Sequence, residues 1–265
     1  MPHFLHFHNP LKRLFRGIYK HKESFLTQAF KEKNRVISFL QDPRHFTVIR
    51  WRHFLDQCYV PKIFYDIGAN DPFSVEGQQI LFKPLMPHTQ FYLFEAMSKH
   101  EPALIRSGEP YAIVVLGEHD GAIKTFYETK ASLIGTGDSY YLEKTPFYSS
   151  DSMIMTQHST KKLDTLVKEK GWPFPDFMKL DTQGSELDIL RGATRCLANT
   201  NAIQIESNIQ QYNEGAPLFQ DVLAFMQTAG FCLYDLVQFH FNPHGVLFQT
   251  DMMFIRHHLL MKGKH

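Results

Sequence analysis

Three apolar runs, each closed by an acidic residue, stand out in the pattern of hydrophobic and polar positions along the chain. They are Ile63–Asp66, Gln90–Glu95 and Phe177–Asp181. Short runs of aliphatic and aromatic residues are typical of strands buried in a parallel sheet. Because the carboxyl ends of parallel strands meet at one edge of an open α/β sheet, where ligands bind, we expect the three acids to lie in one site.

The segments between and after these runs predict the alternating helices and strands of an α/β fold. We expect helices over residues 73–85, 97–107, 159–170 and 217–229, another from Glu186, and strands over residues 111–116, 202–206, 231–239 and 246–255. The last two strands are joined by too few residues for a crossover helix, so they must pair antiparallel. Residues 122–128 predict an extra strand, in a hairpin that turns at residues 119–121.

Charge divides the chain into two parts. Residues 1–60 hold 11 lysines and arginines against 4 acidic residues, whereas the remainder holds 17 against 23. Pro61 breaks the helical pattern between the two parts. We therefore predict a basic helical N-terminal extension over residues 1–60 and a separate domain over residues 61–265.

Three helices are expected in the extension. Asn9-Pro10 predicts the start of an amphipathic helix with basic flanks, and residues 30–40 and 43–57 predict the other two. A basic amphipathic helix fits an anionic membrane surface, its own domain or a partner subunit. These alternatives, and a homodimer, stay open at this point.

The composition indicates the class of protein and its compartment. A length of 265 residues with 43% hydrophobic content fits one α/β domain plus an appendage. Cys58, Cys196 and Cys232 match no metal spacing and favour a reducing compartment. No stretch approaches the ~20 apolar residues of a membrane span. The basic N-terminus lacks the apolar segment of a secretory signal, so we expect a cytoplasmic protein.

The turn after the first apolar run indicates which ligand the sheet edge binds. It carries Asp66, Gly68 and Asn70, whereas dinucleotide-binding turns need the three glycines of G-x-G-x-x-G, so an NAD oxidoreductase is disfavoured. A carboxylate here would repel a pyrophosphate but suit a cationic cofactor such as S-adenosylmethionine. Glu95, at the end of the second strand, is placed to bind ribose hydroxyls.

Residues 129–156 are the least regular part of the chain. They are rich in glycine, serine, threonine and tyrosine and include the pair Tyr140-Tyr141. Loops this long inside a compact domain are usually functional or disordered. Aromatic and hydroxyl side chains suit a sugar or another polyhydroxyl acceptor, so we predict a mobile loop on the substrate side, with a variable surface loop as the alternative.

Four motifs follow one another along the chain. They are DIGAN at residues 66–70, FEA at 94–96, V-L-G-E-x-D-G at 115–121 and K-L-D-x-x-G-x-E-x-x-x-L-x-G-A at 179–193. Over roughly residues 61–257, this order and spacing resemble the FkbM-type methyltransferases. The chain departs from the family at Asp71-Pro72-Phe73, where members usually have a small, glycine-containing turn.

The resemblance implies a class I methyltransferase that uses S-adenosylmethionine. Its fold is α/β and Rossmann-like: a seven-stranded, mostly parallel sheet with an antiparallel C-terminal strand pair, here with the N-terminal helical extension. The resemblance also places Gly117 and Glu118 near the adenine of the cofactor.

Methyl transfer to a hydroxyl needs a positioned base, because the hydroxyl holds its proton tightly. Asp181, at the end of its strand, and Glu186, at the start of the next helix, are the candidate catalytic residues, and Asp181 is also expected to contact the cofactor. Alternatively, both acids stabilise the start of that helix. A Mg²⁺ ion on Asp181, Glu206 and Asn208, as in catechol-type methyltransferases, is a further hypothesis that we do not favour.

The resulting prediction is an O-methyltransferase that acts on a hydroxyl of a sugar, a polysaccharide, or a glycosylated or polyketide metabolite. This acceptor class comes from the resemblance, and the expected partner is a small molecule or a glycan. One alternative is a nucleic-acid methyltransferase, suggested by the basic N-terminus but disfavoured because the chain lacks the Asn/Asp-Pro-Pro-Tyr/Phe loop of that class. Another is a scaffold protein that keeps the fold without catalysis.

Overall fold

The computed structural model describes residues 43–74, 79–130, 137–144, 149, 151–242 and 244–260. The chain divides into two compact units, Met1–Phe46 and Thr47–His265, and the second is described here. The helices expected before residue 43 lie outside the described residues. In the part of the chain that is described, no helix is long and apolar enough to span a membrane.

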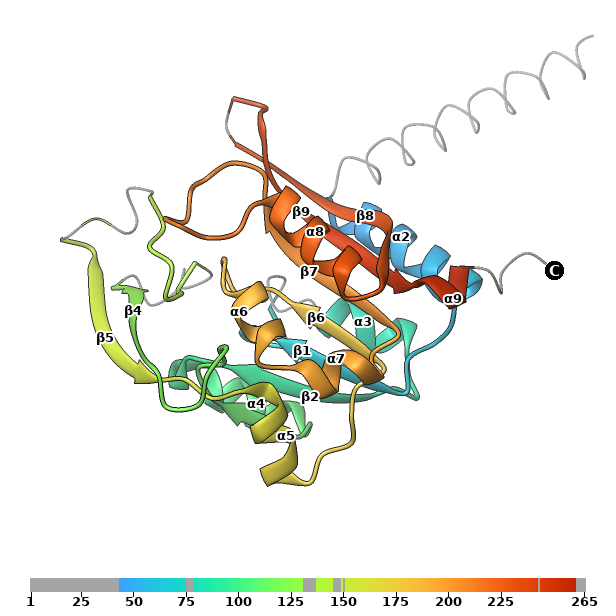
Figure 1. The fold of residues 1–265 in the computed structure, drawn as a ribbon, viewed down its shortest axis with the longest axis horizontal. Helices are drawn as coiled ribbons and strands as arrows, with labels where there is room; N and C mark the ends of the chain where they lie inside the picture. The colour runs from blue at the N-terminus through green and yellow to red at the C-terminus, as the bar shows by residue number, and fades with distance from the viewer. Residues whose placement is uncertain are drawn as a thin grey trace, which may run out of the picture. The chain divides into compact units, whose positions relative to one another are not determined.

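A seven-stranded sheet forms the centre of the second unit (Figure 1). In spatial order its strands are β3 (Tyr111–Ile113), β2 (Gln90–Glu95), β1 (Ile63–Ile67), β6 (Phe177–Leu180), β7 (Ala202–Asn208), β9 (Leu247–Arg256) and β8 (Phe231–Phe241). The strands from β3 to β7 are parallel, and β9 is antiparallel to both of its neighbours. The predicted mostly parallel sheet with antiparallel C-terminal pairing is therefore confirmed.

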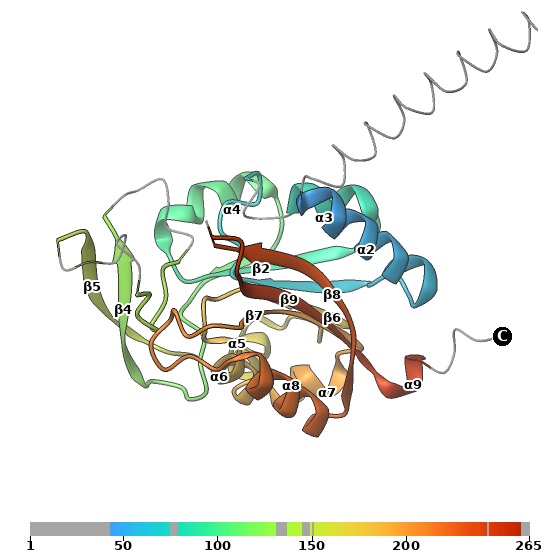
Figure 2. The same cartoon turned by 90° about the horizontal axis from the view of Figure 1, so that it is seen from above.

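Helices cover both faces of this sheet (Figure 2). On one face lie α2 (Pro43–Gln57), α3 (Gln79–Leu85), the 3₁₀ turn η1 (Ser98–His100) and α4 (Glu101–Ser107); on the other lie α5 (Leu163–Lys170), α6 (Glu186–Arg191), α7 (Thr194–Asn199) and α8 (Phe219–Thr228). The short α9 (His257–Leu260) follows β9. Apolar residues of the strands alternate between two buried clusters, one under each helical layer. This arrangement leaves the carboxyl ends of the parallel strands as the edge where side chains meet a ligand.

The core on the α2 face is aromatic. The rings of Trp51 and Phe54 on α2 pack against Phe177, and Trp51 also contacts Phe64 and Phe82. The indole N–H of Trp51 donates a hydrogen bond to the side-chain oxygen of Gln204 on β7, at 2.8 Å. Residues 47–57 of α2 thus belong to the core that surrounds the sheet.

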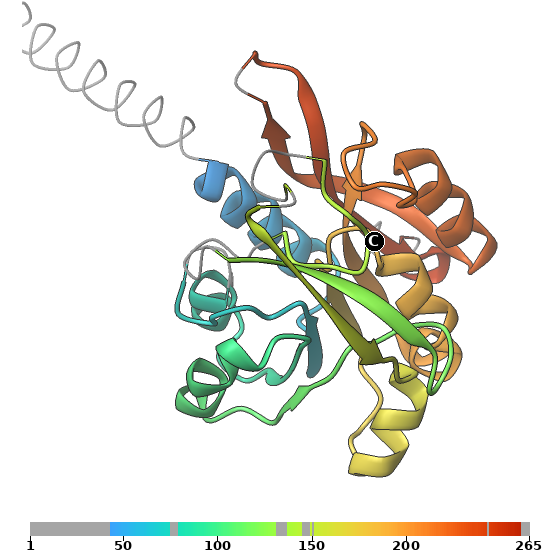
Figure 3. The same ribbon diagram turned by 90° about the vertical axis from the view of Figure 1, so that its left-hand side faces the viewer.

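The predicted hairpin at residues 119–121 does not form in the expected way. The strand β4 (Ile123–Thr129) pairs with β5 (Met153–Ser159) in a separate two-stranded sheet (Figure 3). The first predicted strand of that hairpin ends early, at Ile113, and Leu116 bridges Lys161 instead. The partner of β4 comes from the end of the segment that was predicted to be irregular, so the pairing depends on a contact that local sequence does not reveal.

Two of the expected helices have other structure at their predicted first residues, and polar contacts explain why. Residues 73 and 74 lie in a turn, in which the Asp71 carboxylate accepts the N–H of Phe73 at 2.9 Å. Ser159 is the last residue of β5, and α5 begins at Leu163, after Asp120 accepts the N–H of Lys162 at 2.8 Å. Side chains from outside the predicted helices thus hold these residues in other conformations.

Candidate active site

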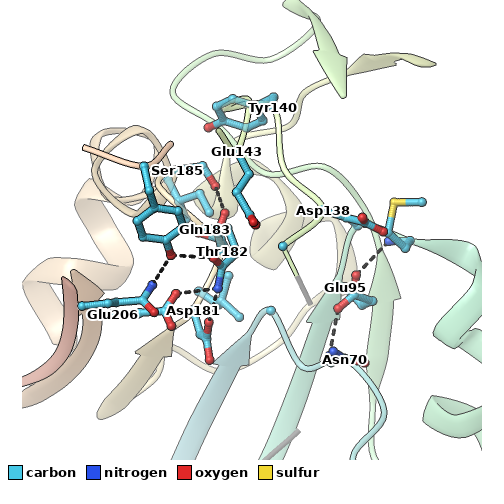
Figure 4. A pocket seen from close by; sticks show the side chains of 18 of the residues that line it. Asn70, Glu95, Asp138, Tyr140, Glu143, Asp181, Thr182, Gln183, Ser185 and Glu206 are labelled. Atoms are coloured by element: carbon cyan, nitrogen blue, oxygen red, sulfur yellow. Dashed lines mark hydrogen bonds between the residues drawn. The ribbon is translucent and has the colours of Figure 1, made fainter. Parts of the chain in front are cut away.

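A pocket of about 850 Å³ lies at the carboxyl edge of the main sheet. Its wall comes from the ends of β1, β2, β6 and β7, from residues 137–143, and from the β8–β9 hairpin. Two acidic regions of this wall are visible in Figure 4: Glu95 with Asn70, and Asp181 with Glu206 and Gln183. Two of the three strand-end acids, Glu95 and Asp181, therefore line one pocket as expected, and Asp66 does not.

Glu95 ends β2 and is held by backbone groups. One carboxylate oxygen accepts the N–H of Asn70 and the other accepts the N–H of Met97, each at 2.9 Å (Figure 4). Burial raises the pKa of Glu95, although these two hydrogen bonds favour its ionised form. Asn70 has φ +50°, so the turn after β1 bends sharply toward this carboxylate.

Gly68 allows the loops after β1 and β6 to touch. It has φ +82°, and a Cβ at this position would lie 1.8 Å from the backbone oxygen of Asp181. No other residue type fits that contact and that backbone conformation. The glycine thus brings the Glu95 and Asp181 regions onto one wall of the pocket.

Asp181 lines the pocket, and a buried lysine stabilises the negative charge of its carboxylate. The Lys179 ammonium lies 3.1 Å from an Asp181 oxygen and 3.5 Å from an Asp66 oxygen. Burial alone would raise the pKa of Asp181, but the Lys179 charge and a hydrogen bond from Glu206 lower it below its ordinary value. Asp181 is therefore an ionised carboxylate at neutral pH.

Asp66 does not reach the pocket. It is opposite Lys179 in the β1–β6 register, so both side chains project from the same face of the sheet, and both are fully buried. Asp66 also accepts a hydrogen bond from the Gln79 amide at 2.9 Å. Burial raises the pKa of Asp66, and Lys179 only partly offsets this. The predicted cofactor contact of Asp66 is thus replaced by a structural role as the counter-ion of Lys179.

Glu186, a predicted catalytic residue, lies behind the pocket wall. One of its oxygens accepts the N–H and the hydroxyl of Thr182, at 2.8 and 3.1 Å, and the N–H of Gly184 at 3.2 Å. Burial raises the pKa of Glu186 to about 7 despite these hydrogen bonds. Glu186 is not among the lining residues; it fixes the loop at the start of α6 instead.

Gly117 and Glu118 also lie away from the lining residues. Gly117 donates its N–H to the oxygen of Lys161, and a Cβ on Gly192 would lie 2.2 Å from the oxygen of Gly117. The side chain of Glu118 is 42% exposed, near His119. The residues just before this turn, 114–116, line the pocket in its place.

A hydrogen-bonded network that the sequence did not predict extends from Asp181 across the pocket. The Gln183 amide donates to Glu206 at 2.7 Å and to Asp181 at 3.4 Å, and it accepts the Tyr212 hydroxyl at 3.0 Å. Gln249 on β9 donates to the Tyr212 oxygen at 2.6 Å. Burial and the charges of Asp181 and Asp251 raise the pKa of Glu206 well above its ordinary value, in the opposite direction to the shift at Asp181.

The segment predicted as a substrate-side loop contributes part of the wall. Tyr140 lines the pocket, and Tyr140 and Tyr141 donate hydrogen bonds to Asp188 on α6, at 3.3 and 3.0 Å. Asp138 also lines the pocket and forms an ion pair with Lys99. Residues 131–136, 145–148 and 150 of this segment lie outside the described residues. The described part is anchored to the elements around the pocket.

In the Mg²⁺ ligand set of Asp181, Glu206 and Asn208, which the sequence did not favour, Asn208 bonds to other side chains. The Asn208 amide donates to Asn213 at 3.2 Å and accepts from Gln249 at 3.4 Å, and Asn208 is absent from the lining residues. The described charged residues that line the pocket are carboxylates and imidazoles, without lysine or arginine: Glu95, His100, Asp138, Glu143, Asp181, Glu206 and His240. This wall suits a cationic ligand and disfavours a polyanion.

Comparison with known proteins gives one family match and several structural similarities. The model of the methyltransferase FkbM domain family matches residues 66–233. Among solved structures, the chain is similar to precorrin-6y C5,15-methyltransferase from Geobacter metallireducens GS-15, at 10% identity and TM-score 0.43, with 80% of this chain and 87% of that chain covered. It is also similar to 1,6-didemethyltoxoflavin-N1-methyltransferase from Burkholderia thailandensis, at 11% identity and TM-score 0.42, with 96% and 93% covered. No curated protein matches the chain.

Removing the Lys179 charge should destabilise the protein. We expect Lys179→Met to lower the free energy of unfolding by about 3–5 kcal/mol at neutral pH, because Asp66 and Asp181 lose their buried counter-ion. The loss should shrink as the pH falls and these carboxylates become protonated. The measurement is urea unfolding at a series of pH values from about 4 to about 8.

The matched control is Lys161→Met. Lys161 forms an ion pair with Glu169, but both side chains are at least one third exposed. Such a surface pair contributes about 0–1 kcal/mol, so this variant should remain close to the wild type. Equal losses in the two variants would contradict the buried role of Lys179.

Proposed function

Because the chain belongs to the methyltransferase FkbM domain family, we propose that it methylates a hydroxyl of a sugar, a polysaccharide, or a glycosylated or polyketide metabolite, with S-adenosylmethionine as the methyl donor. One observation carries the proposal. A strand-end carboxylate suited to a ribose, Glu95, and an ionised carboxylate suited to a hydroxyl acceptor, Asp181, line the same pocket.

The residues around Glu95 fit the cofactor. Each Glu95 oxygen accepts one backbone N–H, and a carboxylate oxygen can accept a second hydrogen bond, so the ribose hydroxyls have acceptors available. Met97 and residues 114–116 provide apolar wall beside Glu95 for the adenine. S-adenosylmethionine, when bound, supplies a methyl group on a positively charged sulfur, and the carboxylates of this wall suit that charge.

The opposite part of the pocket fits a polyhydroxyl acceptor. Gln183, Tyr212 and Gln249 present amide and phenol groups there, next to Asp181 and Glu206. Such groups donate and accept hydrogen bonds, as recognition of several hydroxyls requires. In this proposal Asp181 accepts a hydrogen bond from the reacting hydroxyl and takes its proton, and Lys179 keeps Asp181 ionised for that task.

The charge of the pocket wall can be compared with what a nucleic-acid substrate would need. Proteins that bind nucleic acids place lysines and arginines along the phosphates. The described lining residues include neither type. Charge therefore favours a neutral hydroxylated acceptor over a nucleic acid.

Cofactor binding can be tested at Glu95. We expect Glu95→Ala to weaken binding of S-adenosylhomocysteine at least tenfold, because the ribose loses its hydrogen-bond acceptors, which corresponds to about 1.4 kcal/mol. The measurement is a calorimetric titration of the full chain. Glu118→Ala is the matched control, since Glu118 is exposed and lies away from the lining residues, and its affinity should equal that of the wild type.

Two outcomes would count against the proposal. Failure of the wild type to bind S-adenosylhomocysteine would remove its basis and favour a non-catalytic scaffold. A loss of affinity in Glu118→Ala but not in Glu95→Ala would place the nucleoside at a different wall.

The two acids predicted to be catalytic should behave differently. We expect Asp181→Asn to lower turnover by about 10²–10⁴-fold, because the reacting hydroxyl loses its proton acceptor, and to leave the affinity for S-adenosylhomocysteine within about threefold. Glu186→Gln keeps the oxygen that accepts the bonds from Thr182 and Gly184, so its turnover should stay near the wild-type value.

A panel of sugars, glycans and hydroxylated polyketides would first be screened for an acceptor. Turnover would then be measured as transfer of a labelled methyl group from S-adenosylmethionine to that acceptor. Full activity in Asp181→Asn would exclude Asp181 as the base. A large loss confined to Glu186→Gln would return that role to Glu186.

A further inference from the structure

We propose that this protein binds a divalent transition-metal ion of the Mn²⁺ or Zn²⁺ type at Glu206, His240 and Asp251. Each of the three side chains offers one ligand atom, and the three atoms all lie within 4.8 Å of one another. Ligands that share one ion at about 2.0–2.2 Å lie about 3–4 Å apart, so small side-chain movements would close this triangle around an ion.

The fold places these ligands together. Glu206 on β7 and Asp251 on β9 are direct partners in the antiparallel register, so their side chains project from the same face. His240 lies on β8, the other neighbour of β9, and its Nε2 is 3.7 Å from an Asp251 oxygen. Three adjacent strands thus supply one ligand each, on a rigid part of the sheet.

Hydrogen bonds outside the triangle orient the two carboxylates. One Asp251 oxygen accepts the Gln204 amide, whose own oxygen is held by the indole N–H of Trp51, and the other Asp251 oxygen is the one near His240. One Glu206 oxygen accepts the Gln183 amide at 2.7 Å. Metal sites in proteins typically have such outer partners, which fix the direction of each ligand.

The local charge also calls for a cation. The carboxyl groups of Asp66, Asp181 and Asp251 interact with Lys179, and Glu206 interacts with Asp181 and Asp251. Among the described residues, His240 adds a positive charge to this group only when it is protonated. Lys179 is already shared between Asp66 and Asp181. Buried carboxylates are stable when they are paired, protonated or bound to a metal, and a divalent ion would compensate this group directly.

The ligand types indicate the class of ion. An imidazole together with two carboxylates suits Zn²⁺ or Mn²⁺, whereas Mg²⁺ and Ca²⁺ prefer oxygen ligands alone. This set differs from the Asp181, Glu206 and Asn208 set considered from the sequence, because Asn208 bonds to Asn213 and Gln249.

The position of the triangle gives the ion a role. Glu206 and His240 line the same pocket as Asp181, on its acceptor side. An ion there would bind a hydroxyl of the acceptor and make it easier to deprotonate next to Asp181. This role rests on the proposed function, whereas the binding of the ion does not.

The test is a calorimetric titration of the metal-free full chain with Zn²⁺, Mn²⁺ and Mg²⁺ salts. We expect a site on the wild type that binds Zn²⁺ more tightly than Mn²⁺ and Mg²⁺ most weakly. His240→Gln should lower the affinity of that site for Zn²⁺ and Mn²⁺ at least tenfold. Four histidines among residues 1–42 can also bind Zn²⁺, so the assignment depends on the difference between variants and on the Mn²⁺ titration.

His158→Gln is the matched control. His158 also lies near a carboxylate, Glu128 at 4.0 Å, and its side chain is 34% exposed against 31% for His240. It belongs to no group of three metal-ligand side chains among the described residues. This variant should bind both ions as the wild type does.

A second variant covers the case in which His240→Gln fails to fold, as judged by circular dichroism. Glu206→Gln keeps the size of the side chain and an oxygen for the Gln183 amide, and it should also lose the site. Wild-type affinity for Mn²⁺ and Zn²⁺ in either folded variant, no binding by the wild type, or equal losses in His158→Gln would overturn the proposal.

The two proposals can fail separately. Binding of S-adenosylhomocysteine to the metal-free chain without any Mn²⁺ or Zn²⁺ site would overturn the metal proposal and leave the proposed function standing. Metal binding without cofactor binding would do the reverse.

Discussion

The buried ammonium of Lys179 is the constraint on which the arrangement of this sheet edge depends. A fully buried charge is costly unless counter-ions meet it with good geometry, and Asp66 and Asp181 do so from two directions. The β1–β6 register places Asp66 directly opposite Lys179, and Asp181 follows two residues later along β6. One interaction therefore joins two central strands and fixes the carboxylate that faces the pocket.

Three acids at this edge acquire different properties because their surroundings differ. Asp66 is enclosed and pairs with the lysine, Asp181 is kept ionised by the same lysine at the pocket wall, and the pKa of Glu206 is raised well above its ordinary value. Pairs of acids whose pKa values are driven apart are typical of sites that move protons. The contact between Gly68 and the Asp181 backbone then brings this group beside Glu95, which backbone N–H groups hold in place.

Much of the framework could be predicted from the sequence because local signals and tertiary structure agree in the central strands. β2 and β6 have the expected bounds, and α6 begins at Glu186 as predicted. The pairing of β4 with β5 was missed because it joins segments separated by a long irregular stretch. Such pairing depends on long-range contacts, which periodicity alone does not encode.

The site was predicted less completely than the fold for a related reason. Asp66 and Asp181 look alike in sequence, since each closes an apolar run, but Asp66 lies within its strand and Asp181 beyond the end of its own. Lys179, a lysine inside an apolar strand, was the signal in the sequence that could have distinguished the roles of the two acids. His240 and Asp251 could not be placed, because the register of β8 and β9 shifts at three irregularities along the hairpin. Glu186 was assigned to catalysis because a capping carboxylate and a catalytic one have the same sequence pattern.

The most direct test of this account is a crystal structure of the full chain with S-adenosylhomocysteine. We expect the ribose hydroxyls to lie within hydrogen-bond distance of Glu95 and the sulfur to face the side of the pocket that holds Asp181, with Asp66 out of contact. A nucleoside bound elsewhere, or bound in this pocket without contact to Glu95, would contradict it.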